Sequence, residues 1–274
     1  MERTNRGVQV GLLTKFRRNF LRRKQIKNRR RTIAAALQTL QPTRTVLHGP
    51  FKGMLYPKLD SVGSALYPKL LGSYEYELNG IIEQVIGNKY TEIVDIGCAE
   101  GYYAVGLSMR CPNAKVFAFD TNTKAIQLCR EMMQLNGIEA SRYSVNGYCD
   151  SNTLENIPVS ERALIISDCE GYEKQLFTSS SVKKLNKHEF LIEVHDVFDI
   201  NVSTHLRNVF EPEYQIRVIQ SIDDIFKARD YNYPELNNFN LETRKILLAE
   251  GREAIMEWFY ITRKEVDNTP TQQK

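Results

Sequence analysis

The sequence predicts an α/β fold with a doubly wound, mostly parallel sheet, and three observations support it. Residues 91–120 read as a strand, a glycine-containing turn, a helix and a second strand. Short apolar runs then alternate with helical segments along the chain, which is the pattern of successive β/α units. Two of these runs end in an acid, Asp120 and Asp168. The carboxyl ends of parallel strands meet at one edge of a sheet, where ligands bind, so a ligand site is expected there.

The chain begins with a basic, helical extension, residues 1–45. Residues 1–31 hold twelve Lys and Arg against one acid, whereas the rest holds 25 bases and 32 acids, so a segment of charge +11 precedes a body of charge −7. Leu12, Phe16 and Phe20 recur at a spacing of four, which predicts an amphipathic helix. Residues 12–31 then bind an anionic membrane surface or, less favoured, nucleic acid. The plain alternative is a solvated extension that packs on the body.

Residues 46–264 form the main domain, and residues 265–274 a disordered tail. Residues 47–57 are rich in turn formers and aromatic residues, which predicts a loop or short hairpin over the mouth of a site. Apolar stripes and end signals predict the helices. The predicted helices are Ile33–Leu40, Tyr74–Ile86, Tyr103–Ser108, Thr121–Leu135, Ser151–Ile157, Gly171–Leu185, Val202–Phe210 and Leu241–Glu250.

The strands are predicted from short apolar runs, which are typical of strands buried on both faces of a sheet. They are Glu92–Gly97, Lys115–Phe119, Arg142–Val145, Arg162–Asp168, Glu189–Asp196, Tyr214–Gln220 and Ile255–Thr262. The last strand has no room for a long crossover helix before it, so we expect it to run antiparallel to its neighbour.

Composition sets the broad class of protein. Hydrophobic residues make up 42% and charged residues 26%, as in ordinary globular proteins. No apolar run reaches the ~18 residues of a membrane span, and Lys15 and Arg17 interrupt any secretory signal. The five cysteines are scattered without a CxxC pair, which argues against a disulfide framework and a zinc cluster. We expect a cytoplasmic protein that can associate through its arm with the inner membrane face.

The glycine turn selects among nucleoside cofactors. A dinucleotide site needs G-x-G-x-x-G, because the pyrophosphate requires close backbone approach. Here Ala99 replaces the second glycine, and Glu100 would repel a pyrophosphate. A cofactor with a positive centre and no phosphate, S-adenosylmethionine, fits better.

Each part of that cofactor has an expected partner. Asp95 would bind the methionine amino group, Gly97 and Gly101 would let the backbone pass close by, and Asp120 would accept both ribose hydroxyls. Residues 146–150 would lie at the adenine. The cofactor-binding residues that we expect are Asp95, Gly97, Cys98, Ala99, Gly101, Tyr102, Asp120, Thr121, Gly147, Cys149 and Asp168.

Three stretches carry a resemblance to a known family. They are Val94–Tyr103, Ser167–Glu173 and Ile192–His195, with support from residues 49–54 and 69–75. The chain resembles class I S-adenosylmethionine-dependent methyltransferases, specifically the FkbM-like branch, over Pro50–Arg263. The resemblance implies a Rossmann-like, seven-stranded sheet with an antiparallel last strand. It also implies O-methyl transfer to a hydroxyl of a sugar, a glycan precursor or a natural product.

The ends of the fourth and fifth strands supply the candidate catalytic groups: Asp168, Glu170, Glu193 and His195. The two-residue period of a strand puts Glu193 and His195 on one side and Asp196 on the other. We predict that His195 is the general base and that Asp168 lies near the methyl-transfer centre. A divalent metal held by these groups is the less favoured alternative, so no metal ligand is assigned. Glu173 is interpreted as a charge at a helix start.

Three other functions compete with this prediction. An RNA methyltransferase would use the basic arm, but enzymes that methylate base nitrogens carry an Asn or Asp-Pro-Pro-aromatic stretch after the fourth strand, and Ser167–Tyr172 holds no proline. A non-catalytic module that only binds the cofactor would keep the same glycines and acids. A nicotinamide oxidoreductase is disfavoured by Ala99 and Glu100.

Overall fold

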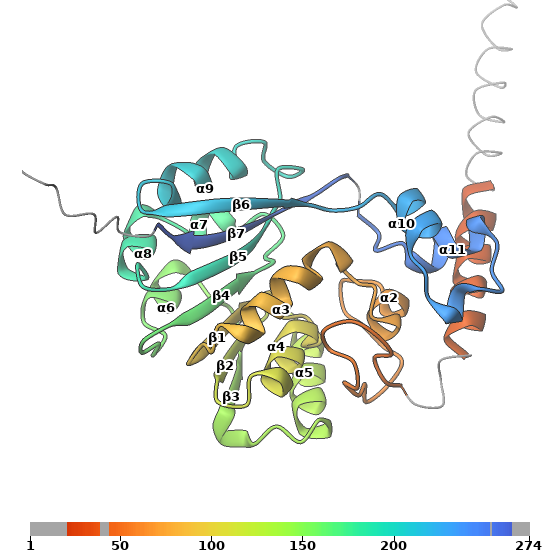
Figure 1. Cartoon of the computed structure of the whole chain (residues 1–274), viewed down its shortest axis with the longest axis horizontal. Coiled ribbons are helices and arrows are strands. Elements are labelled where there is room, and N and C mark those ends of the chain that lie inside the picture. Colours follow the sequence, from red (N-terminus) through yellow and green to blue (C-terminus); the bar gives the residue numbers. More distant parts are fainter. Residues whose placement is uncertain (1–20, 39–43, 253, 265–274) are drawn as a thin grey trace, which may run out of the picture.

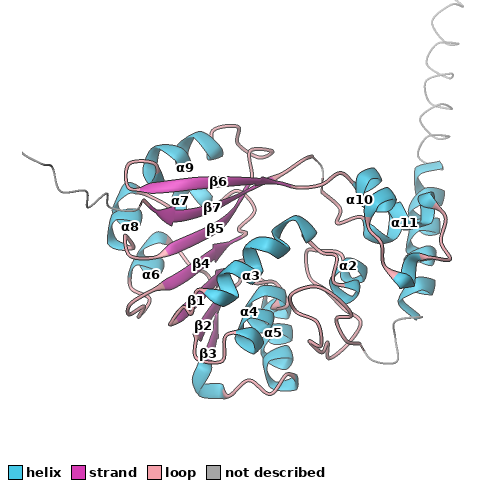
Figure 2. Cartoon of the chain, viewed as in Figure 1, coloured by secondary structure: helices cyan, strands magenta, loops and turns pink. Residues whose placement is uncertain are grey.

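A computed structural model describes residues 21–38, 44–252 and 254–264. Its centre is a seven-stranded sheet in the order β3-β2-β1-β4-β5-β7-β6 (Figures 1 and 2). The strands are β1 (Glu92–Ile96), β2 (Lys115–Phe119), β3 (Tyr143–Asn146), β4 (Ala163–Ser167), β5 (Glu189–Val194), β6 (Tyr214–Gln220) and β7 (Glu257–Arg263).

Strands β1 to β5 pair in parallel, and β7 lies antiparallel between β5 and β6. The predicted α/β class and the antiparallel last strand are therefore confirmed. The chain order reverses at β1, which pairs with β2 on one side and β4 on the other. In open sheets of this kind the crevice beyond such a reversal is where ligands bind.

Helices cover both faces of the sheet (Figure 2). Besides residues 21–38, the helices of the described chain are α2 (Leu66–Leu71), α3 (Asn79–Gly87), α4 (Tyr102–Arg110), α5 (Thr123–Leu135), α6 (Ser151–Glu155), α7 (Glu173–Leu176), α8 (Ser179–Lys184), α9 (Val202–Phe210), α10 (Asp224–Asp230) and α11 (Leu241–Leu248), with 3₁₀ turns at Tyr76–Leu78, Ala140–Arg142 and Pro234–Leu236. Of these, α2, α10 and α11 lie beside the sheet and do not cover its faces (Figure 2). Successive strand residues face opposite cores. Ile93 packs with α3, α4 and α5, whereas Val94 packs with α6 to α9.

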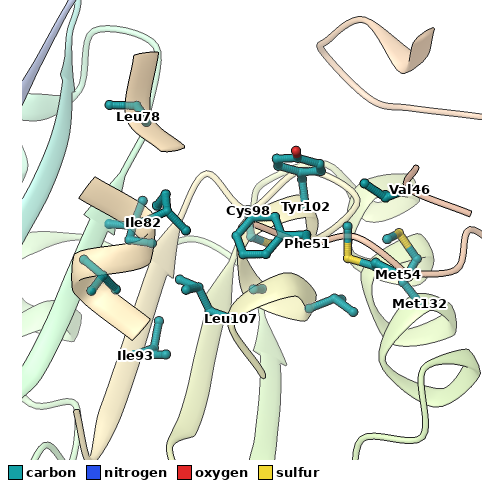
Figure 3. Packing of buried hydrophobic residues seen from close by; sticks show 14 of the residues in the cluster. Val46, Phe51, Met54, Leu78, Ile82, Ile93, Cys98, Tyr102, Leu107 and Met132 are labelled. Carbon is teal, nitrogen blue, oxygen red and sulfur yellow. The ribbon is translucent and has the colours of Figure 1, made fainter. Parts of the chain in front are cut away.

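The segment before the sheet belongs to the core. Val46, Phe51 and Met54 are buried beside Tyr102 and Leu107 of α4 (Figure 3). A Cβ on Gly106 would lie 2.4 Å from the ring of Phe51, so α4 needs a glycine there. The prediction that residues 47–57 cover a site mouth is wrong, because this stretch packs on α4. Residues 62–64 line the cavities instead.

Residues 21–38 form a helix that stands beside α10 and α11, at the end of the molecule away from α8 (Figure 1). Ala36 is buried, and Ile33 and Leu37 pack against the core, whereas residues 21–31 are exposed. The apolar positions Leu12, Phe16 and Phe20 and the tail 265–274 lie outside the described residues. Among the described residues, no helix is both long and apolar enough to cross a membrane.

Two predicted helices need correction. Gly171–Leu185 is two short helices, α7 and α8, because Phe177 leaves the helical conformation and Thr178 caps α8 through a capping box with Ser181. Tyr74–Ile86 is a 3₁₀ turn followed by α3. Helices α2 and α10 were not predicted.

Candidate active site

Two cavities adjoin at the carboxyl ends of β1 and β4. The larger encloses about 420 Å³ and the smaller about 250 Å³. Gly63, Asp168 and Glu170 line both, so a group in one lies next to a group in the other.

Seven of the expected cofactor residues line the larger cavity: Gly97, Ala99, Asp120, Thr121, Gly147, Cys149 and Asp168. The Asp120 carboxylate follows β2 and accepts hydrogen bonds from the backbone N–H of Ala99 (2.9 Å) and Asn122 (2.7 Å). Each carboxylate oxygen has a second lone pair, so Asp120 can still accept from a ligand. These two bonds hold the carboxylate in place at the cavity wall.

Four expected residues do not line the larger cavity. Cys98 and Tyr102 are buried, and Tyr102 packs edge-on against Phe51 and Tyr74. A Cβ on Gly101 would lie 2.9 Å from Sγ of Cys129. Asp95 is buried within β1.

The reason given for Gly97 also changes. Its φ is +83°, and a Cβ there would lie 1.7 Å from the carbonyl oxygen of Asp168. No side chain fits at that distance, so the close approach of the β1 and β4 turns requires a glycine. The approach concerns protein backbone, whereas the sequence analysis expected an approach to the cofactor.

Asp95 has an unusual environment. Its side chain is 3% exposed, and Oδ2 has no hydrogen-bond partner among the described residues. Burial raises the pKa of Asp95 to about 7 from its ordinary 3.8. An unpaired buried carboxylate oxygen costs free energy unless a ligand supplies a donor, so Asp95 fits an amino group.

Glu100 does not face a cofactor, so the electrostatic argument against pyrophosphate does not hold. Its carboxylate is fully buried, 2.6 Å from Nζ of Lys69. It also accepts from Ser61 Oγ (3.0 Å) and from the N–H of Val62 (3.1 Å). Glu100 therefore tethers the segment that lines the cavities. Ala99 alone, in the larger cavity, still departs from the dinucleotide pattern.

The smaller cavity is lined by all four candidate catalytic groups: Asp168, Glu170, Glu193 and His195. The predicted alternation along β5 is confirmed, because Asp196 turns away and accepts from the N–H of Ser203. Nε2 of His195 lies 3.5 Å from Asp168, 3.6 Å from Glu170 and 3.8 Å from Glu193. The ring stacks near Phe198, with centroids 5.8 Å apart.

Glu173 holds the other side of this histidine. Its Oε1 lies 2.6 Å from Nδ1 of His195, and its side chain is fully buried. A carboxylate can only accept, so Nδ1 carries the proton and Nε2 of the neutral ring keeps its lone pair. Sequence reasoning missed this role, although Glu173 is the last residue of the Asp-x-Glu-Gly-x-Glu stretch.

The charges around His195 set its basicity. Burial lowers the pKa of His195, but the hydrogen bond to Glu173 and the nearby carboxylates outweigh it and raise the pKa above 6.5. Burial and the neighbouring Glu193 raise the pKa of Asp168 well above its ordinary value. The site thus combines a basic imidazole with a carboxyl group that is readily protonated.

The sequence analysis also did not identify Arg252 as a residue of the site, because no motif contains it. It contacts Glu193, lies 2.7 Å from Glu75 and 3.1 Å from Glu250, and lines the smaller cavity. Asp168, Glu193 and His195 could together hold a metal ion, since their ligand atoms lie within 4.8 Å of one another. The guanidinium on Glu193 opposes a second cation there, which favours the acid–base interpretation.

The comparisons with known proteins agree with this geometry. Residues 80–167 match the family model of the methyltransferase small domain, which spans α3 to β4. A 68-residue stretch is 31% identical to "Ribosomal RNA small subunit methyltransferase C" of Shewanella amazonensis, covering 25% of this chain and 20% of that protein. The match thus spans about a fifth of that relative's length.

Solved structures resemble the chain weakly, at low sequence identity. A putative O-methyltransferase from Klebsiella pneumoniae is 12% identical with a TM-score of 0.46, covering 70% of this chain and 81% of that one. The O-methyltransferase TomG from Streptomyces achromogenes, solved with S-adenosylmethionine, is 9% identical with a TM-score of 0.45 at the same coverage. The sheet, the paired cavities and the family match together support a class I S-adenosylmethionine-dependent methyltransferase.

Proposed function

We propose that this protein transfers the methyl group of S-adenosylmethionine to a hydroxyl of a sugar, glycan precursor or natural product. The observation that carries the proposal is His195, held by Glu173 on one side and facing the junction of the two cavities on the other. We also propose, from the sequence resemblance alone, that the chain falls in the FkbM-like branch.

The larger cavity suits the cofactor in size and chemistry. Its volume of about 420 Å³ lies in the range of small-molecule sites, roughly 300–1,000 Å³. Asp120, at the cavity wall, would accept from the ribose hydroxyls, and Gly147 and Cys149 would lie at the adenine. Asp95 is buried outside the cavity lining, and its unpaired Oδ2 would bind the amino group directly or through water. When bound, S-adenosylmethionine supplies an electrophilic methyl group.

The smaller cavity would hold the acceptor hydroxyl. Nε2 of His195 takes the hydroxyl proton as the oxygen becomes nucleophilic, and Glu173 stabilises the imidazolium that forms. Exposed Phe198 offers an apolar face next to the carboxylates, which accept hydrogen bonds from further hydroxyls. This chain's residues thus orient the acceptor and remove its proton.

An RNA acceptor is the alternative, and the match to a ribosomal RNA methyltransferase favours it. The smaller cavity opposes it, because four acidic residues line it beside one guanidinium, that of Arg252, and the excess of acids disfavours phosphates. A non-catalytic module that only binds the cofactor is the other alternative, and detection of methyl transfer would exclude it.

Calorimetry with S-adenosylmethionine and with NAD tests the cofactor. We expect binding of the first alone; binding of NAD alone would refute the proposal. Methyl-labelled S-adenosylmethionine is then incubated with fractionated glycans, small metabolites and RNA. Label in an alkali-stable ether of a hydroxylated fraction supports O-methylation, whereas label confined to RNA refutes the acceptor class.

A further inference from the structure

The helix of residues 21–38 carries a dense positive charge that the proposed reaction does not use. Between residues 21 and 31 every residue is exposed and none is acidic. The cations there are Arg22, Arg23, Lys24, Lys27, Arg29, Arg30 and Arg31. We call residues 21–31 the basic helix segment.

Repulsion between like charges destabilises the basic helix segment. Arg23 and Lys27, and Lys27 and Arg31, are like charges four residues apart, which destabilise an isolated helix. No ion pair joins residues 21–31 to the rest of the described chain, although Arg29 acts electrostatically on Asp224 of α10. An anionic partner would relieve the repulsion, so charge complementarity defines the kind of partner.

Exposed apolar side chains accompany the cations. Leu21 and Ile26 on the basic helix segment are 49% and 45% exposed. On α10, which stands beside this helix (Figure 1), Ile225 and Phe226 are 51% and 50% exposed. Leu21 and Ile26 stand among Lys and Arg, and the guanidinium of Arg229 lies over the ring of Phe226, although Asp223 and Asp224 precede the α10 pair. Large apolar residues beside cations suit a bilayer, whose surface takes up both the charge and the apolar side chains.

We propose that the basic helix segment, with Ile225 and Phe226 of α10, is a docking surface for an anionic lipid bilayer. Nucleic acid fits the cations but gives Leu21, Ile26 and Phe226 no apolar phase to enter.

Co-sedimentation of the full chain with vesicles tests the proposal. We expect binding to phosphatidylglycerol-containing vesicles, no binding to pure phosphatidylcholine, and weakening with added salt. The triple variant Arg22→Gln, Lys24→Gln and Lys27→Gln should bind about 100-fold more weakly, since each cation near such a surface contributes about fivefold. Gln keeps the helix propensity.

Matched variants distinguish binding through this surface from a general effect of net charge on vesicle binding. Replacing Lys52, Lys183 and Lys187, which are exposed on the body, by Gln removes the same charge and should leave vesicle binding unchanged. Phe226→Ser should weaken it, whereas Leu135→Ser, 43% exposed on α5, should not.

Three results would overturn the proposal. The first is an equal loss of vesicle affinity in the triple variant of the basic helix segment and in the triple variant of the body lysines. The second is equal binding to both vesicle types. The third is binding of a mixed-sequence RNA without binding of anionic vesicles. Cofactor affinity, measured alongside, should be the same in all variants. These outcomes are independent of whether the protein methylates a hydroxyl.

Discussion

At the residue scale, the candidate site depends on a histidine whose two nitrogens face different environments. The two-residue period of β5 was enough to predict that Glu193 and His195 share a side. Glu173 could not be predicted, because α7 brings it to Nδ1 of His195 across 22 residues of chain. Which residues meet across elements depends on how short helices pack, and no local pattern records this.

Replacing the proposed base should separate chemistry from binding. His195→Gln should lower turnover about 10²- to 10⁴-fold and leave S-adenosylmethionine affinity unchanged, because His195 lines only the smaller cavity. Single-turnover methyl transfer and calorimetry measure the two effects. His48→Gln is the matched control, since His48 pairs with Glu235 outside both cavities. Full activity of His195→Gln would remove His195 as the base.

Glu173→Gln should act through His195. The amide can donate to Nδ1, which puts the proton on Nε2 and disables the base, so we expect turnover to fall about 100-fold or more. Loss of the carboxylate should also lower the pKa of His195. Since the neutral ring is the base, the acidic limb of the pH–rate profile should move to lower pH. An unshifted limb would show that Glu173 has only a packing role.

Asp95→Asn should raise stability and weaken cofactor binding. The folded pKa of about 7 lies above the ordinary 3.8, so the stability contribution of Asp95 is complete below about pH 4 and lost as pH rises through 7. Removing the buried charge should raise the free energy of unfolding at pH 8 by up to about 4 kcal/mol. Denaturant titrations at pH 4 and pH 8 measure this. Unchanged S-adenosylmethionine affinity would contradict the proposed contact with its amino group.

At the element scale, the sequence predicted the strands better than the helices. Strands buried on both faces are continuous apolar runs, and all seven were placed within a few residues. Helix α10 has no clear apolar stripe, since Ile225 and Phe226 are exposed while Lys227 is buried against Glu250. Its position is set by contacts made elsewhere in the chain, which a local pattern does not contain.

The tether between Glu100 and residues 61–62 allows stability and binding to be separated. Glu100→Leu leaves Lys69 buried without its partner and should destabilise the fold by about 3–5 kcal/mol. The double variant with Lys69→Met should recover most of this loss. Both variants remove the acceptor of Ser61 and Val62, so both should bind S-adenosylmethionine more weakly. Wild-type affinity in the double variant would show that the tether is dispensable.

At the scale of the whole molecule, the basic segment ends at one residue of the chain and the packed core begins at another. The charge changes sign after residue 31, and the same helix becomes part of the core at Ile33, Ala36 and Leu37. Composition located the first boundary. Composition could not locate the second boundary, because the helix of residues 21–38 stands beside α10 and α11, which come much later in the chain (Figure 1).

Two truncations distinguish these boundaries. Deleting residues 1–31 should leave the free energy of unfolding nearly unchanged, because residues 21–31 are exposed. Deleting residues 1–43 also removes Ile33, Ala36 and Leu37 and should cost about 2–5 kcal/mol through lost apolar burial. Urea unfolding followed by Trp258 fluorescence, with S-adenosylmethionine calorimetry on each protein, measures both. Equal losses in the two truncations would mean that residues 1–31 contribute to the core, whereas loss of cofactor affinity in the shorter truncation would couple the basic helix segment to the site.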